Sequence, residues 1–216
     1  MKVSPTAPGE GGRLTALAEY DLLDTPNEEI FDALARAAAA LCGASVGLIT
    51  IVGKDRLWFK AHHGLAGVTG AKRAGSFCAA TIAQGEIFEV SDARSDPRFA
   101  ENAMVAGKPH VRFYAGTPLV NAAGVALGTL CALDPAPRTL TAEQRAGLAA
   151  LADAVMQQFE QRRRLRSDQS QINERLRLLS AAMDATEEPV TITQVSAGER
   201  DTDKIVYANE AYLRSK

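Results

Sequence analysis

The sequence is short of the features that mark several large classes of protein. Cysteine occurs only three times in 216 residues, at Cys42, Cys78 and Cys131. The count is odd and no two of them are spaced as Cys-x-x-Cys, which argues against a disulfide framework or a zinc site. We therefore expect buried thiols in a reducing, cytoplasmic compartment. The sequence requires no metal and no cofactor.

An excess of one charge and long apolar runs are also missing. The formal net charge is −2, whereas binding to phosphates needs a clear basic excess, so nucleic acid is not an expected partner. No apolar run approaches the roughly 20 residues of a membrane-spanning helix, so no membrane segment is expected. The N-terminus lacks the apolar core of a secretory signal and is rich in proline and glycine. Residues 1–12 are therefore predicted to be a disordered lead-in.

A change of hydrophobic period along the chain predicts alternating helices and strands. In Thr25-Pro26-Asn27-Glu28 the Thr and Glu stand three residues apart, as in a helix capping box, and Gly43 suits the end of the helix that follows. Runs rich in β-branched residues predict strands and hairpins. The expected elements are helices over 13–23, 26–42 and 76–84, and strands over 46–52, 56–63, 87–90, 111–120 and 125–133.

The last predicted hairpin has two apolar faces. Alternate residues from Leu127 to Leu133 include Thr129 and Cys131, whereas the alternate residues from Ala126 to Ala132 are mostly small. A strand that is apolar on both sides belongs to a sheet covered on both sides. The small face suits a packed helix, and the face with Thr and Cys suits the wall of a cavity.

A long helix is predicted after a second capping box, Thr141-Ala142-Glu143-Gln144. Apolar residues then recur at spacings of three and four in one heptad frame, which is typical of a coiled coil. An amphipathic helix lying on its own sheet is the alternative for the first part, up to Phe159. Beyond Arg162 we expect a homodimeric coiled coil. The apolar seam is Leu148, Leu151, Val155, Leu165, Ile172, Leu176, Leu179 and Met183, and the same frame also holds Gln158, Arg162 and Gln169.

Two further strands are predicted near the C-terminus. Pro189 to Thr193 is the first, a polar loop follows, and Ile205 to Glu210 is the second, with the start of a helix. Two strands alone cannot bury a core. The segment is therefore expected to be the beginning of a further domain.

Seven stretches of the chain form a recognisable pattern. They are Leu23-Asp24-Thr25-Pro26, Trp58-Phe59-Lys60, Ser76-Phe77-Cys78-Ala79, Asp96-Pro97-Arg98-Phe99, Arg112-Phe113-Tyr114-Ala115-Gly116, Pro118-Leu119 and Leu127-Gly128-Thr129-Leu130-Cys131. These stretches resemble bacterial GAF domains placed ahead of histidine kinases and diguanylate cyclases, and the tail from Pro189 is similar to the opening of a PAS domain.

The resemblance implies an α+β fold, with a GAF-like central antiparallel sheet of about six strands, helices on one face and a pocket on the other, extended by a long C-terminal coiled-coil helix. It divides the chain into a lead-in (1–12), a GAF domain (13–140), a signalling helix (141–187) and a truncated N-terminal part of a PAS domain (188–216).

This resemblance implies a sensory input module of a multidomain bacterial signalling protein, such as a two-component system. The module would relay a small-molecule or conformational signal through a dimeric helix to a kinase or diguanylate cyclase output domain. The segment itself is expected not to be an enzyme. Its expected partners are a second copy of the chain and a small-molecule ligand of unknown identity.

Ligand contacts are expected mainly in the polar segment 92–112, because loops held by a rigid sheet often carry recognition. An Asp-Arg pairing that pins this loop is the structural alternative. The candidates for the pocket are Trp58, Phe77, Cys78, Asp92, Arg94, Arg112, Tyr114, Thr129 and Cys131.

Cys78 leaves other functions open beside a structural thiol, which is the favoured interpretation. A free methionine sulfoxide reductase needs a nucleophilic thiol and a resolving thiol, and Cys78 and Cys131 could meet across the pocket. A bilin photosensor would attach its pigment to Cys78, but the His usual after that Cys is Ala79 here. Similar domains often carry a His at the position of Ala80. Haem bound through His110 is a further alternative.

Overall fold

The computed structural model describes residues 9–65, 67–194 and 204–215. It consists of two compact units, Met1–Arg163 and Arg164–Lys216, which we describe separately. The first part of the predicted lead-in and most of the polar loop near the C-terminus lie outside the described residues. Residues 10–12, which were expected to be disordered, begin a helix instead. Within the described ranges, no helix is long and apolar enough to cross a membrane.

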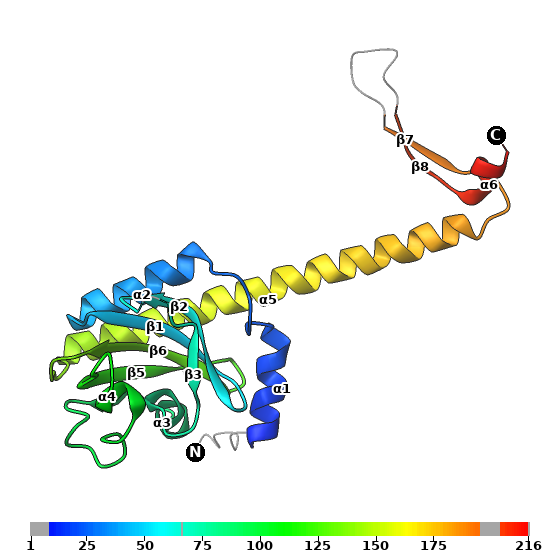
Figure 1. The fold of residues 1–216 in the computed structure, drawn as a ribbon. Helices are drawn as coiled ribbons and strands as arrows, with labels where there is room; N and C mark the ends of the chain where they lie inside the picture. The colour runs from blue at the N-terminus through cyan, green and yellow to red at the C-terminus, as the bar shows by residue number, and fades with distance from the viewer. Residues whose placement is uncertain (1–8, 66, 195–203, 216) are drawn as a thin grey trace, which may run out of the picture. The chain divides into compact units, whose positions relative to one another are not determined.

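The first unit is built on one sheet of six antiparallel strands (Figure 1), in the order β3-β2-β1-β6-β5-β4. This confirms the predicted fold class. The strand β3 lies in a stretch for which the sequence predicts no helix or strand. The strands are β1 Val46–Val52, β2 Arg56–His63, β3 Gly70–Lys72, β4 Phe88–Val90, β5 Phe113–Val120 and β6 Ala126–Asp134.

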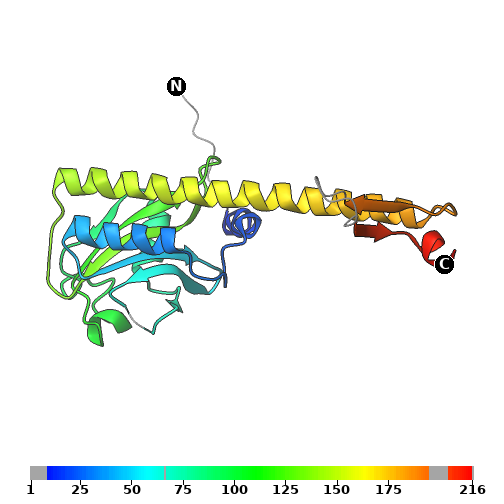
Figure 2. The same cartoon turned by 90° about the horizontal axis from the view of Figure 1, so that it is seen from above.

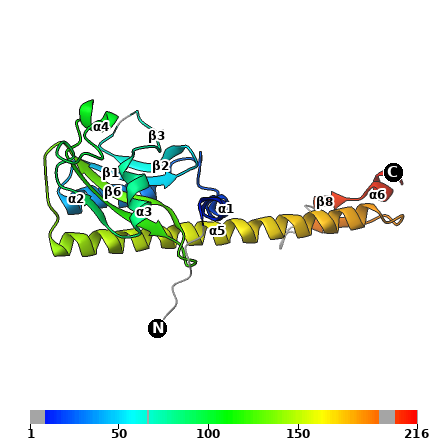
Figure 3. The same ribbon diagram turned by 90° about the horizontal axis from the view of Figure 1, so that it is seen from below.

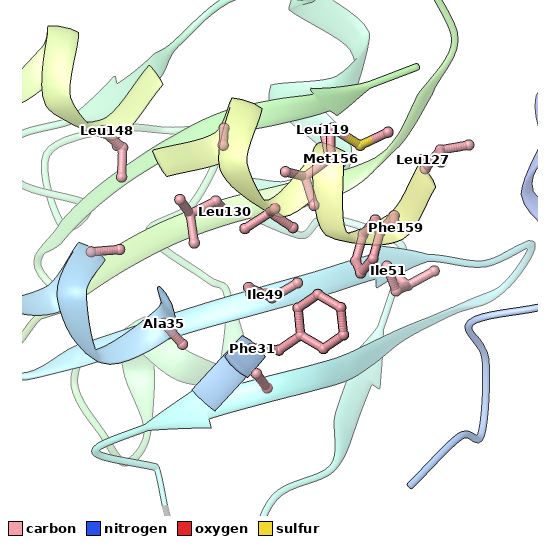
Figure 4. Close-up of a cluster of buried hydrophobic side chains, with 14 of the residues drawn as sticks. Phe31, Ala35, Ile49, Ile51, Leu119, Leu127, Leu130, Leu148, Met156 and Phe159 are labelled. Atoms are coloured by element: carbon pink, nitrogen blue, oxygen red, sulfur yellow. The ribbon is translucent and has the colours of Figure 1, made fainter. Parts of the chain in front are cut away.

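One face of the sheet, which we call the helix face, is covered by α1 (Glu10–Tyr20), α2 (Glu29–Cys42) and the first part of α5 (Ala142–Asp184). Figure 2 shows α2 and α5 side by side above the strands. The rings of Phe31 and Phe159 meet with their centroids 5.0 Å apart, and Figure 4 shows them among the aliphatic side chains of the strands. Both residues are buried. The main core of the unit therefore lies on the helix face.

The opposite face, which we call the cavity face, carries two much shorter helices. These are α3 (Phe77–Gln84) and α4 (Ala103–Ala106), and Figure 3 shows α4 on the side of the sheet away from α5. A second buried apolar cluster lies here and contains residues of the sheet and of α3. The two helices are too short to cover the whole sheet, so this face is only partly filled.

Two β-bulges change which side chains point to which face. The register between β1 and β2 shifts so that Lys60 has no partner residue, and the register between β5 and β6 shifts so that Leu127 has none. A bulge of this kind re-aims the side chains beside it. Leu127 therefore joins the core of the helix face, and the expectation that it shares a face with Cys131 is wrong. Cys131 and Leu133 do lie on the cavity face.

The two predicted capping boxes have different outcomes. At the start of α5, Thr141 Oγ1 accepts from the Gln144 N–H at 3.2 Å and Gln144 Oε1 accepts from the Thr141 N–H at 2.9 Å, which confirms that box. The box at Thr25 is wrong, because α2 begins at Glu29 and no side chain caps it. The Thr25 hydroxyl donates to the Leu22 carbonyl at 2.8 Å.

The predicted dimerisation residues divide into two groups. Leu148 and Val155 are fully buried in the core of the unit and Leu151 is packed against it. These three cover their own sheet, so their assignment to a dimer seam is corrected. Further along α5, the side chains are exposed or, for Met183, half-buried. The exposed fractions are 62% for Leu165, 54% for Ile172, 58% for Leu176 and 53% for Leu179.

The second unit holds the remainder of α5, the hairpin of β7 (Thr191–Gln194) and β8 (Lys204–Ala208), and α6 (Glu210–Arg214). Asn209 ties these parts together. Its buried side chain donates to the Met183 carbonyl at 3.0 Å and accepts from the Tyr212 N–H at 3.0 Å. Ile192 and Val206 of the hairpin are about half exposed, at 48% and 52%.

Candidate functional site

A cavity of about 430 Å³ opens on the cavity face. Strands β1, β2, β3, β5 and β6 supply part of its wall, and the segments around α3 and α4 supply the rest. Most of its surface is apolar, which is typical of a site for a small organic molecule. The lining residues are Leu48, Leu57, Phe59, Ala71, Lys72, Ala74, Gly75, Ser76, Phe77, Cys78, Arg98, Glu101, Asn102, Ala103, Met104, Tyr114, Cys131 and Leu133.

A second hollow of about 330 Å³ adjoins the first. The two share Phe59, Ala71 and Met104 as lining residues. The second hollow is also mainly apolar, with Leu65 and Val68 in its wall. A ligand of the main cavity therefore has an apolar extension beside it.

A cluster of thiols and hydroxyls lies at the inner wall of the main cavity. Cys78 stands in the first turn of α3, and Cys131 lies on β6; both line the cavity and both are buried. The Tyr114 hydroxyl approaches the Cys78 sulfur at 3.9 Å. Thr50 and Thr129, which are cross-strand partners, are fully buried beside them. Neither threonine hydroxyl has a hydrogen-bond partner in the part of the chain that is described.

The two thiols influence each other. The neighbouring thiol of Cys131 has the largest effect, and with the nearby hydroxyls of Thr129, Thr50 and Tyr114 it outweighs burial and lowers the pKa of Cys78 to about 7. The same interaction with Cys78, added to burial, raises the pKa of Cys131. The pair therefore loses its first proton much more readily than its second.

Tyr114 is held over the cavity wall by its neighbours. Its ring stacks on Phe77 with centroids 4.8 Å apart, and its hydroxyl lies 2.8 Å from the Thr81 hydroxyl. Burial raises the pKa of Tyr114, so it stays a neutral hydroxyl. A Cβ at Gly116 would lie 2.1 Å from this hydroxyl. Glycine at that position therefore provides the space for the tyrosine.

The loop of residues 92–112 is pinned by its own side chains. Arg94 pairs with Asp92 at 2.9 Å, and neither lines a described cavity. Arg112 donates to the Val105 and Val111 carbonyls, both at 3.0 Å, and does not line the cavity either. This is the structural alternative foreseen for the loop. Arg98 of the same loop, whose charge also makes it a possible ligand contact, does line the cavity.

Trp58 is also placed away from the cavity. It packs against the core of the helix face, with the Arg56 guanidinium 5.7 Å from its ring centroid. Its neighbour Phe59 is the residue of β2 that lines the cavity. Of the nine predicted pocket residues, the structure brings together Phe77, Cys78, Tyr114, Thr129 and Cys131 and leaves out Trp58, Asp92, Arg94 and Arg112.

A charged cluster on the helix face was missed by the sequence analysis. The ammonium of Lys60 is buried and donates to Thr25 Oγ1 at 2.9 Å, the Pro26 carbonyl at 2.7 Å and Glu28 Oε1 at 2.6 Å. Glu28 also pairs with Arg162 of α5. Burial lowers the pKa of Lys60 despite its carboxylate partner. A lysine between apolar residues in a strand is the one sequence signal of this arrangement.

A second set of polar contacts joins α1 to the same turn of α5. The Tyr20 hydroxyl donates to Glu160, and burial and this carboxylate raise the pKa of Tyr20 to about 12. Arg163 pairs with Glu160 at 3.1 Å and with Glu19 at 3.3 Å. We call the contacts of residues 160, 162 and 163 with α1 and with the segment before α2 the clasp. The clasp lies at the last turn of α5 that belongs to the first unit.

The alternatives for a bound group find little support in these positions. His110 is exposed and lines neither of the described hollows. Among the described residues, no group of three or more His, Cys, Asp or Glu side chains could hold a metal ion. Cys42, the third thiol, lies on the helix face, where burial raises its pKa to about 11.

Comparisons with known proteins agree with this architecture. The GAF domain family matches residues 26–159 of the chain. A cyclic di-GMP phosphodiesterase from Pseudomonas aeruginosa is 39% identical over 144 residues, which are 67% of this chain and 24% of that protein. The chain thus spans about a quarter of the length of that relative.

Two solved structures illustrate the likeness of fold. The GAF domain from an Acinetobacter phosphoenolpyruvate-protein phosphotransferase superposes with a TM-score of 0.54 at 14% identity, covering 75% of this chain and 99% of that chain. The free methionine-R-sulfoxide reductase from Neisseria meningitidis, solved with its substrate, superposes with a TM-score of 0.51 at 20% identity, covering 76% of this chain and 99% of that chain. Identities this low establish the fold alone.

Proposed function

The chain belongs to the GAF domain family, and we propose that it is the sensory input module of a larger signalling protein. In this proposal a small molecule enters the cavity, and α5 carries the effect to a downstream domain. The module itself is not an enzyme. Its match to part of a cyclic di-GMP phosphodiesterase supports a signalling role. The three free thiols suit a reducing compartment, which supports a cytoplasmic location.

One observation carries the proposal: strand β2 connects the cavity to α5. Phe59 lines the cavity on one side of the sheet. The next residue, Lys60, holds Glu28 on the other side, and Glu28 holds Arg162 of α5. A ligand that displaces β2 would therefore change the clasp. Such a change is a population shift between two arrangements of a helix relative to its support.

We further propose that α5 pairs with a second copy of the chain beyond the clasp. Its apolar residues there follow heptad spacing, and Leu165, Ile172 and Leu176 are each more than half exposed. An apolar stripe of this kind is expected to be covered by a partner helix. Gln169 interrupts the stripe and bonds to Asn173 at 2.9 Å. A polar interruption weakens the pairing locally, which suits a helix that must shift.

The output end of the protein is the third part of the proposal. The hairpin of β7 and β8 leaves apolar side chains half exposed, as expected for part of a PAS domain. The output domain that we propose is a kinase or a diguanylate cyclase. A small molecule in the cavity would then alter that enzyme's rate through α5.

The clasp can be tested in the full-length signalling protein. Glu28→Gln removes the carboxylate shared by Lys60 and Arg162, and we expect the basal output activity to change several-fold. Glu29→Gln is the matched control, because Glu29 is the exposed first residue of α2. Unchanged output in a folded Glu28→Gln protein would contradict the proposed coupling.

The dimer can be tested on this chain by sedimentation. Ile172→Glu with Leu179→Glu places charges on the apolar stripe, and we expect a dimer to become a monomer. Ser167→Glu with Ser170→Glu adds the same charge elsewhere on exposed positions of α5 and should leave the dimer intact. A wild-type chain that is monomeric at high micromolar concentration would rule out pairing through α5 alone.

A further inference from the structure

The cavity leads from the surface of the protein toward two buried thiols. Its lining includes exposed residues, Lys72 and Glu101, as well as the buried Cys78 and Cys131. Its volume is about 430 Å³, whereas one water molecule occupies about 30 Å³ in the liquid. Cys78 is 5% exposed, so a small reagent can approach it from solvent without unfolding the unit, whereas Cys131 is 0% exposed and has no contact with solvent.

The surroundings of Cys78 favour an anionic sulfur. Cys78 lies in the first turn of α3, where the positive end of the helix dipole favours negative charge. Thr50 and Thr129 are fully buried beside it, and their hydroxyls lack partners in the described structure. A buried hydroxyl without a partner is costly and needs an explanation. A thiolate or sulfenate at Cys78 would accept hydrogen bonds from both.

The third cysteine has none of these features. Cys42 lies near the end of α2, on the helix face, and it lines no described hollow. Its surroundings are the packed apolar core of that face. The molecule thus holds one thiol in a packed core and two thiols that line the cavity, which makes Cys42 an internal reference for reactivity.

From this arrangement we propose that Cys78 and Cys131 are a redox-reactive dithiol, which a small hydroperoxide entering the cavity converts to an intramolecular disulfide. The inference rests on the proposed sensory function, because it names the chemical class of signal that the cavity receives. It gives the chain a stoichiometric, reversible modification and does not make it a catalyst. A disulfide between these residues would tie α3 to β6 and fix the inner wall of the cavity.

The chemistry balances in two steps. The Cys78 thiolate attacks the terminal oxygen of the hydroperoxide, the O–O bond breaks, and the leaving alkoxide takes a proton to become an alcohol, which leaves Cys78 as a sulfenic acid. The Cys131 sulfur then attacks the Cys78 sulfur. The S–S bond forms, and the departing hydroxide leaves as water with the proton of Cys131. Two thiols and one hydroperoxide thus give one disulfide, one alcohol and one water.

The test treats the reduced chain with hydrogen peroxide, then unfolds it and counts free thiols with a maleimide under non-reducing conditions. We expect the three thiols of the chain to fall to one, with Cys78 and Cys131 in one cross-linked peptide and Cys42 still free. Dithiothreitol should restore the full count. Cys42→Ser should retain the cross-link.

Two variants separate the roles of the two cysteines. Cys131→Ser should stop at a sulfenic acid on Cys78, trapped by a dimedone-type reagent, whereas Cys78→Ser should give neither product. The proposal is overturned if Cys42 reacts as fast as Cys78, if the disulfides join different chains, or if all thiols survive peroxide that oxidises an unfolded control. These readouts concern this chain alone, so they are independent of the output assay that tests the sensory function.

Discussion

The two faces of the sheet are built from alternate residues of the same strands, yet they differ in how completely they are covered. On the helix face, α2 with 14 residues and the first part of α5 lie over the strands, and their side chains fill the space. On the cavity face, α3 has eight residues and α4 has four, and a cavity of about 430 Å³ is left. The strands are apolar on both sides, so their pattern fits both a filled face and a face with a cavity. The two faces differ in the length of the helices that cover them.

The largest effect that would test this difference comes from two leucines on β6. Leu130 is packed in the core of the helix face, and Leu133 lines the cavity. We expect Leu130→Ala to lower the free energy of unfolding by about 4 kcal/mol and Leu133→Ala by about 2 kcal/mol, because fewer neighbours are lost at an existing cavity. Urea unfolding of both variants measures the difference. Equal losses would mean that the cavity face is as tightly packed as the helix face.

Adding a methyl group at one of two glycines gives a similar comparison of the helix face with the cavity face. A Cβ at Gly47 would lie 2.0 Å from the Ala35 carbonyl oxygen, which is backbone of α2. A Cβ at Gly116 would lie 2.1 Å from the Tyr114 hydroxyl, a side-chain atom beside the cavity. We expect Gly47→Ala to cost about 3 kcal/mol and Gly116→Ala about 1 to 2 kcal/mol, because the tyrosine has space to move into.

The same two glycine-to-alanine variants can also be compared by spectroscopy and by thiol reactivity. Gly116→Ala should alter the near-ultraviolet circular dichroism of the tyrosine and change the reaction of Cys78, whereas Gly47→Ala should change stability only. A Gly116→Ala protein with wild-type spectrum and thiol reactivity would count against the role given to Tyr114.

The smallest expected effect concerns the attachment of α1 to the helix face. Hydrogen bonds from Arg13 and Arg73 lower the pKa of Glu10 from 4.5 to about 2. A carboxyl with a lowered pKa in the folded state stabilises the fold above its unfolded pKa and loses that effect as pH falls. We therefore expect a loss of about 1 kcal/mol, after allowance for solvent screening, between pH 4.5 and 2. Glu10→Gln should lack this component in a pH series of thermal unfolding, and an identical pH profile would refute it.

The periodic elements could be predicted from the sequence because local chemistry determines them. The run of β1, the αL glycine at Gly43 that ends α2, and the reciprocal capping of Thr141 with Gln144 all follow from residues that are neighbours in the chain. Cys78 and Cys131 line the same cavity, because the period of two on β6 directs Cys131 to that face and the first turn of α3 carries Cys78.

The features that could not be predicted depend on residues distant in sequence. Thr25 and Glu28 form a plausible capping box locally, but the ammonium of Lys60 takes both side chains for its own hydrogen bonds. The sequence offers Trp58 as a candidate for the pocket, whereas the pairing of β2 with β1 turns it to the helix face. The charges of segment 92–112 predict ligand contacts, whereas in the structure Asp92 and Arg94 pair with each other.

The two bulges have a consequence for insertions and deletions in the sheet. Each adds a single residue to a strand whose remaining residues keep regular alternation: Phe59 and Ala61 stay on opposite faces around Lys60, and so do Ala126 and Gly128 around Leu127. A hairpin lacking Lys60 would thus keep every other side chain on its present face and lose only the ammonium that holds Glu28. The cavity and the link between β2 and Glu28 are therefore separable, and a one-residue deletion at Lys60 would remove that link while preserving the cavity.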